Sequence, residues 1–209
     1  MIGHALAFAP RPATQVAWNR AISVGFALGS ACFLIGPFPG FVQLVGAEAD
    51  AAVFFAGSIL FTFAALLEVR EATVRRGRRW GRDPSWWSAA VQFVGTLLFN
   101  LSTYDALQDT LTVHEEDRLI WTPDLIGSIA FLVSGVLAYR VAAAAGRRDR
   151  DWRMAAINLA GCVLFGVSAI GAYIVPSTGT ELDLALANWG TSLGALCFLI
   201  CAVMVYPRR

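Results

Sequence analysis

The sequence predicts an all-α integral membrane protein with six transmembrane helices, arranged as three tandem two-helix hairpin repeats. Three observations predict this fold class. The chain of 209 residues is 57% hydrophobic and only 15% charged, whereas soluble domains carry about 25% charged residues. Six apolar stretches are long enough to cross a bilayer, and the same short motif occurs once in each. The net charge of +1 gives no basic footprint for a nucleic-acid partner.

The six stretches are defined by their length, because a helix that rises 1.5 Å per residue needs about 20 apolar residues to cross a hydrocarbon layer about 30 Å thick. The expected spans are Ala21–Val45, Asp50–Val69, Trp86–Leu107, Asp124–Ala144, Met154–Val175 and Asn188–Tyr206. They divide the chain into a lead-in (1–20), one bundle (21–206, with hairpins 21–69, 86–144 and 154–206) and a tail (207–209).

The first span contains two prolines near its far end, in the run Gly36-Pro37-Phe38-Pro39-Gly40. Proline removes a backbone hydrogen-bond donor and clashes with the preceding helical turn. We therefore expect this helix to kink or unwind there, where other parts of the protein cover the freed backbone groups.

The arginines predict the orientation, because cytoplasmic loops of membrane proteins retain positive charge. If the N-terminus is inside the cell, the cytoplasmic loops and helix ends hold all the basic residues except Arg118. We expect a multi-pass protein of the cell membrane with both termini cytoplasmic and the lipid bilayer as its first partner. The loop Arg70–Asp83 holds six arginines, which satisfy this rule and could also attract anionic lipid headgroups.

The repeated motif is Gly-x-x-x-Phe, followed three residues later by a small residue. Its copies are Gly29/Phe33, Gly57/Phe61, Gly95/Phe99, Gly127/Phe131, Gly161/Phe165 and Gly194/Phe198. Random placement of 19 glycines and 14 phenylalanines gives roughly one such pair. This spacing places the three residues on one stripe of a helix, and small residues are where membrane helices pack closely. We therefore expect the stripe to face protein.

A longer correspondence supports the hairpin repeat. The residues Trp86, Gln92, Gly95, Phe99 and Ser102 recur 66 positions later as Trp152, Asn158, Gly161, Phe165 and Ser168. Because all six helices carry the stripe while alternating in direction, the bundle could be pseudo-symmetric about an axis in the membrane plane.

The paired runs Gly29–Gly36 and Gly57–Phe61 resemble the YrhK-like family, small two-helix membrane domains rich in Phe-x-x-Gly-Ser. The resemblance covers the first hairpin well and the other two loosely. It implies a small membrane protein and carries no established activity across.

Polar side chains within the spans have two interpretations. No ionisable residue lies at a helix centre, which argues against a proton-coupled pump. Gln92, Asn100 and Asn158 could join helices by hydrogen bonds worth about 0.6–2 kcal/mol each, the more common use. Alternatively, they line a path for a small uncharged solute, with Asn100, Tyr104 and Asp105 at its outer mouth.

The sequence contains no recognisable catalytic motif, and we expect a protein that is not an enzyme. The run His114–Asp117 contains metal-ligating residue types, but consecutive residues rarely converge on one ion, so we expect a solvated loop and no metal site. The only histidines, His4 and His114, lie outside the spans, so no haem or other cofactor is expected.

Two functions remain. The first is a non-catalytic structural or accessory role, in which small-residue pairs such as Gly25/Gly29, Gly36/Gly40 and Gly190/Gly194 pack against each other, a second copy or another membrane protein. The second is a channel or facilitator for a small uncharged solute. The absence of charge at mid-span favours the first. A polar cavity reaching mid-membrane between the third and fifth helices favours the second, and a dry Phe/Gly core favours the first.

Overall fold

The computed structural model describes residues 13–76, 81–108, 110–145 and 149–207. The predicted lead-in up to residue 12, with His4, lies outside these residues, as do 77–80 of the arginine-rich loop and 208–209 of the tail. The described chain is all-helical apart from one small β-hairpin. Its long helices are α1 (Ala13–Ile35), α3 (Ala47–Arg76), α4 (Pro84–Asp105), α6 (Thr122–Ala144), α7 (Arg150–Gly171) and α8 (Leu184–Val205).

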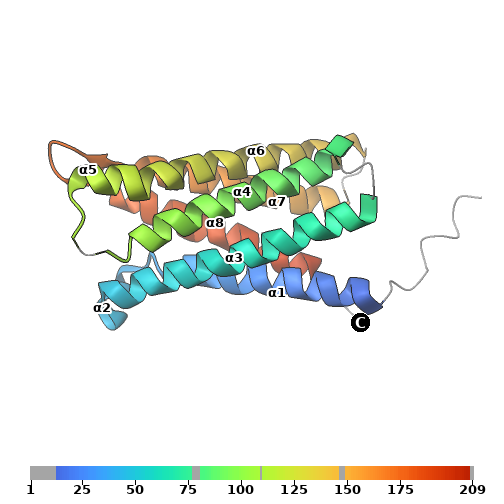
Figure 1. The fold of residues 1–209 in the computed structure, drawn as a ribbon, viewed down its shortest axis with the longest axis horizontal. Coiled ribbons are helices and arrows are strands. Elements are labelled where there is room, and N and C mark those ends of the chain that lie inside the picture. The colour runs from blue at the N-terminus through green and yellow to red at the C-terminus, as the bar shows by residue number, and fades with distance from the viewer. Residues whose placement is uncertain (1–12, 77–80, 109, 146–148, 208–209) are drawn as a thin grey trace, which may run out of the picture.

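The short elements gather at one end of the bundle, as Figure 1 shows. They are α2 (Pro39–Val45), α5 (Val113–Glu116) with the π-helical turn Asp117–Trp121 that joins it to α6, and the antiparallel strands β1 (Ile174–Val175) and β2 (Thr180–Glu181). We call this end distal. The proximal end is the one where α1 begins and α8 ends.

The long helices form a closed ring, because each packs along two neighbours in the order α1, α3, α4, α6, α7, α8 and back to α1. A hydrogen bond joins every neighbouring pair. In ring order these bonds are Gln15–Glu71, Ser58–Thr103, Ser88–Ser134, Ser128 to the Phe165 carbonyl, Ser168 to the Ala187 carbonyl, and Ser192 to the Leu34 carbonyl. The last bond connects the final helix to the first and closes the ring.

In the part of the chain that the structure describes, five segments are long and apolar enough to cross a membrane, whereas six were expected. They are Gln15–Ile35, Ala47–Val74, Val113–Ala144, Arg150–Gly171 and Leu184–Val205. The exception is α4, which is long enough but lacks a continuous stretch of sufficient hydropathy, because Gln92, Asn100 and several hydroxyl residues interrupt its apolar residues. Its place in the ring is the same as that of the other long helices.

The helix boundaries follow local signals. Asp83, Asp149 and Asp183 cap α4, α7 and α8, each accepting a hydrogen bond from a backbone N–H of the first turn, as capping residues do. These helices therefore begin two to four residues earlier than the hydropathy boundaries. At the prolines α1 ends at Ile35 and α2 begins with Pro39 as its first residue.

The glycines of the repeated motif face each other within each hairpin. A Cβ added at Gly29 would lie 2.9 Å from the carbonyl oxygen of Gly57 and 2.9 Å from Cδ2 of Phe61, and one at Gly57 would lie 3.0 Å from Cδ2 of Phe33. The same crossed arrangement joins Gly95 to Gly127 and Phe131, Gly127 to Phe99, Gly161 to Gly194 and Phe198, and Gly194 to Phe165. Each phenylalanine thus fills the space that the facing glycine leaves.

Candidate functional site

The phenylalanines of the motif meet at the centre of the helical ring and block its interior. All six are at most 6% exposed and belong to one buried cluster. Phe33, Phe99 and Phe165 form one triangle of rings with centroids 5.8–6.5 Å apart. Phe61, Phe131 and Phe198 form a second triangle with centroids 5.8–6.5 Å apart. We call these two triangles the phenylalanine plug.

A cavity of about 440 Å³ extends from the proximal end down to the second triangle. Phe61, Phe131 and Phe198 line its deep end, whereas exposed residues such as Ala145 and Asp151 line its rim. Its volume lies in the range typical of small-molecule sites, about 300–1,000 Å³. We call it the proximal cavity.

Two of the predicted polar residues line the proximal cavity. Gln92 of α4 accepts a hydrogen bond from Ser134 at 3.3 Å, and Asn158 of α7 donates to the thiol of Cys162 at 3.9 Å. Both side chains therefore lie at a cavity wall and also contact other polar groups. The cavity reaches the middle of the bundle between the third and fifth long helices, but the plug ends it there.

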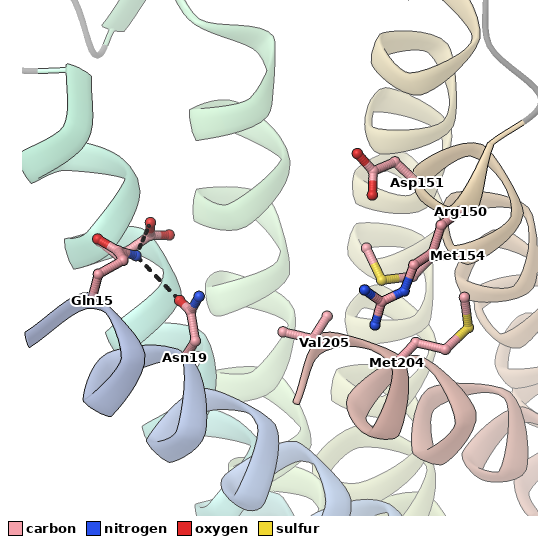
Figure 2. Close-up of a pocket in the computed structure, with 8 residues that line it drawn as sticks. Gln15, Asn19, Arg150, Asp151, Met154, Met204 and Val205 are labelled. Carbon is pink, nitrogen blue, oxygen red and sulfur yellow. Dashed lines mark hydrogen bonds between the residues drawn. The ribbon is translucent and has the colours of Figure 1, made fainter. Parts of the chain in front are cut away.

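A polar side cavity of about 530 Å³ adjoins the proximal cavity and shares Asp151, Met154 and Val205 with it. Figure 2 shows Gln15 of α1 donating hydrogen bonds to Asn19 at 3.2 Å and to Glu71 at 2.8 Å on one wall. The start of α7, including Arg150, forms the opposite wall. This wall brings a positive charge close to the entrance of the proximal cavity.

A third cavity, of about 570 Å³, extends from the distal end to the first triangle, and we call it the distal cavity. Phe33, Phe99 and Phe165 line its deep end. Its wall contains the indole of Trp121, whose Nε1 donates to the carbonyl oxygen of Ala169 at 2.8 Å. The two main cavities therefore approach opposite faces of the same plug.

The residues expected at the outer mouth do not line the distal cavity. Tyr104 is 57% exposed and packs its ring 5.8 Å from Phe55, and Asp105 accepts a hydrogen bond from Gln108. At about 100° per residue, Asn100, Tyr104 and Asp105 lie about 100–140° around α4 from the inward-facing Phe99. Ser102 and Thr103, which are closer in phase to Phe99, are buried and line the cavity instead.

Carboxylate side chains that the sequence reading did not select line both cavities. They are Asp50, Glu116, Asp124 and Glu181 at the distal cavity, and Glu68, Asp149 and Asp151 at the proximal cavity. Asp50 and Asp124 stand in the first turns of α3 and α6. The sequence shows that Asp50 and Asp124 each lie just outside an apolar run. It does not show which helices face them, because that depends on the closure of the helical ring.

The acidic residues that follow Thr112 lie at the start of helix α5. Glu115 and Thr112 form a capping box, in which the Glu115 carboxylate accepts from the Thr112 N–H at 2.9 Å and from its hydroxyl at 2.7 Å. Within the described residues, no three His, Cys, Asp or Glu groups come close enough to hold a metal ion. The Glu115 carboxylate therefore stabilises the first turn of α5.

The small-residue pairs are used mainly inside the ring. A Cβ at Gly25 would lie 2.9 Å from Cβ of Ala64, and one at Gly190 would lie 2.8 Å from Cβ of Ser168. Gly40 alone among these pairs has no atom within 4 Å of an added Cβ.

Comparison of the chain with known protein families, curated proteins and solved structures finds no match. The resemblance to YrhK-like domains therefore stays a prediction.

Proposed function

We propose that this protein is a gated facilitator that lets a small solute cross a membrane through the centre of the helical ring. One observation carries the proposal: cavities from opposite ends of the bundle stop at opposite faces of one phenylalanine plug. Hydrophobic constrictions of this kind gate pores by excluding water. Each triangle closes one cavity, so an outward movement of the phenylalanine rings within both triangles would join the two cavities.

The proposal includes six membrane-crossing helices and an internal repeat. α4 lies between α3 and α6 in the ring, so a bundle that crosses a bilayer takes α4 with it. Gln92, Ser102 and Thr103 of this helix are tolerated because they face a cavity instead of lipid. The crossed Gly–Phe contacts of α1/α3, α4/α6 and α7/α8 support three equivalent hairpins around one axis.

Solute flux into proteoliposomes tests this function. We expect the wild-type chain to move at least one solute from a panel of glycerol, urea and choline faster than empty liposomes do. Phe61→Ala removes one ring of the plug and should raise the leak of the whole panel by about tenfold or more, because an aperture opens at the constriction. Phe63→Ala is the matched control, since Phe63 lies two residues away on α3 and is 51% exposed.

A structural or accessory role is the second candidate, and the closed plug favours it. Six close-packed aromatic rings between the two cavities fit a rigid core that holds the helices together. This role predicts that both the wild-type chain and Phe61→Ala stay as tight as empty liposomes to every solute of the panel, and that Phe61→Ala only lowers stability. That result contradicts the facilitator.

A further inference from the structure

We propose that the distal cavity binds an organic ammonium cation. This inference rests on the proposed function and names the class of solute that the cavity selects. It replaces the uncharged solute expected from the spans alone, because the charges that matter stand at the cavity walls and not at the helix centres.

The first argument is the sign of the charges. The chain has 16 basic and 15 acidic residues, so a cavity of no particular preference would show both signs. Among the described residues that line the distal cavity, four are acidic and none is basic. Arg118, the arginine near this end, is exposed and is not part of the lining. A cavity lined by one sign of charge concentrates ions of the opposite sign.

The second argument is the aromatic lining. Phe33, Phe99 and Phe165 form the floor, and Phe54 and Trp121 stand in the wall. A small metal ion would lose hydration against such a surface without replacement, whereas an alkylated ammonium ion is attracted by aromatic rings through cation–π interaction. Carboxylates together with aromatic rings therefore fit an organic cation better than a metal ion or a neutral solute.

The third argument is an unpaired acceptor. One carboxylate oxygen of Asp50 is buried and has no hydrogen-bond partner in the described structure. A buried acceptor without a partner costs free energy, which a bound cation can offset. The carboxylates do not converge on a point that could hold a metal ion. This lining fits a larger and more diffuse positive charge better than it fits a metal ion.

The test compares choline with 3,3-dimethylbutan-1-ol, which carries a carbon in place of the quaternary nitrogen. Isothermal titration uses the full chain in nanodiscs of phosphatidylglycerol. We expect choline to bind at least about tenfold more tightly than the alcohol. This ratio corresponds to a binding free energy in the range of the interaction of one charge pair near a protein surface. This comparison needs no variant and so does not depend on the folding of one.

Asp50→Asn and Asp124→Asn should each weaken choline binding by about tenfold and leave binding of the alcohol unchanged. The matched control is Glu48→Gln, which removes the same charge from the exposed first turn of α3 outside the cavity. It should leave choline binding unchanged. Competition by added phosphatidylcholine assigns the site to a lipid headgroup, and lack of competition assigns it to a free ammonium compound. Both results support the cation class.

Equal binding of choline and the alcohol overturns the inference, as does unchanged choline binding in both carboxylate variants. The proposed function is tested independently of the cation site. Choline binding without flux of any panel solute keeps the site and removes the facilitator. Flux of glycerol without a preference for choline keeps the facilitator and removes the cation site.

Discussion

Ser88 and Ser134 bind each other's backbone across the interface between α4 and α6. The Ser88 hydroxyl donates to the carbonyl oxygen of Ser134 at 3.0 Å, and the Ser134 hydroxyl donates back to the carbonyl oxygen of Ser88 at 2.8 Å. The two hydroxyl oxygens lie 3.1 Å apart, and both residues are buried. Because each carbonyl accepts a hydroxyl from the facing helix, this pair joins α4 to α6 at the wall of the proximal cavity.

A double-mutant cycle should detect this coupling. Ser88→Ala and Ser134→Ala should each destabilise the protein, and their effects should fail to add by about 0.6–1.7 kcal/mol, the range of polar pairs in membrane helices. The measurement is reversible unfolding in mixed micelles. Ser30→Ala is the control, because Ser30 is equally buried but its hydroxyl has no partner, and it should cost nothing. Strict additivity of the two serine variants contradicts the prediction.

Two glycines of α7 should respond oppositely to alanine. A Cβ at Gly161 would lie 2.8 Å from Cε1 of Phe198 and 3.1 Å from the carbonyl oxygen of Gly194, so Gly161→Ala should cost about 1–3 kcal/mol through overpacking. Gly166 has no atom within 4 Å of an added Cβ. Gly166→Ala should leave stability unchanged or raise it by about 1 kcal/mol through helix propensity. Thermal unfolding measured by circular dichroism distinguishes the two.

The proposed crossing of the membrane by α4 predicts opposite accessibility of its two ends. Arg82 precedes α4, Gln108 follows it, and both are exposed. In sealed inside-out vesicles, Arg82→Cys should react with a membrane-impermeant maleimide and Gln108→Cys should react only after permeabilisation, as the arginine distribution requires. The unaltered chain measures the background from its native cysteines. Labelling of both positions from the same side excludes a sixth span.

The residue pattern predicts much of the helical core. The Gly-x-x-x-Phe stripe is a local property of each helix, so its spacing correctly places Phe33 and Phe198 in one core although they are far apart in sequence. Boundaries are less predictable from hydropathy. Within the described residues α1 is already helical at Ala13, before the expected boundary at Ala21, because Gln15 and Asn19 reduce the apolar character of this part of the helix.

The candidate site is only partly predictable for a different reason. Gln92 and Asn158 could be placed because they share a stripe with a motif glycine. Tyr104 lies outside the distal cavity because its phase on α4 turns it away from the inward-facing Phe99, although the two residues are close in sequence. Asp50 and Asp124 come together at one cavity only because α3 and α6 both begin at the distal end of a closed ring. The spacing of residues within either helix does not predict that Asp50 and Asp124 lie at the same cavity.

Replacement of the polar lining separates a transport path from structural hydrogen bonding. Gln92→Leu and Asn158→Leu keep side-chain size but remove the amide from the proximal cavity, and each should lower flux of the transported solute by about tenfold, the effect of about 1.4 kcal/mol. Asn100→Leu serves as comparison, because Asn100 lies outside both main cavities and its Oδ1 is buried without a partner. That variant should leave flux unchanged and should not lower stability, since it removes an unsatisfied acceptor. If Gln92→Leu and Asn158→Leu lower stability while flux stays at the wild-type level, the amides only join helices, and the proximal cavity is not part of a solute path.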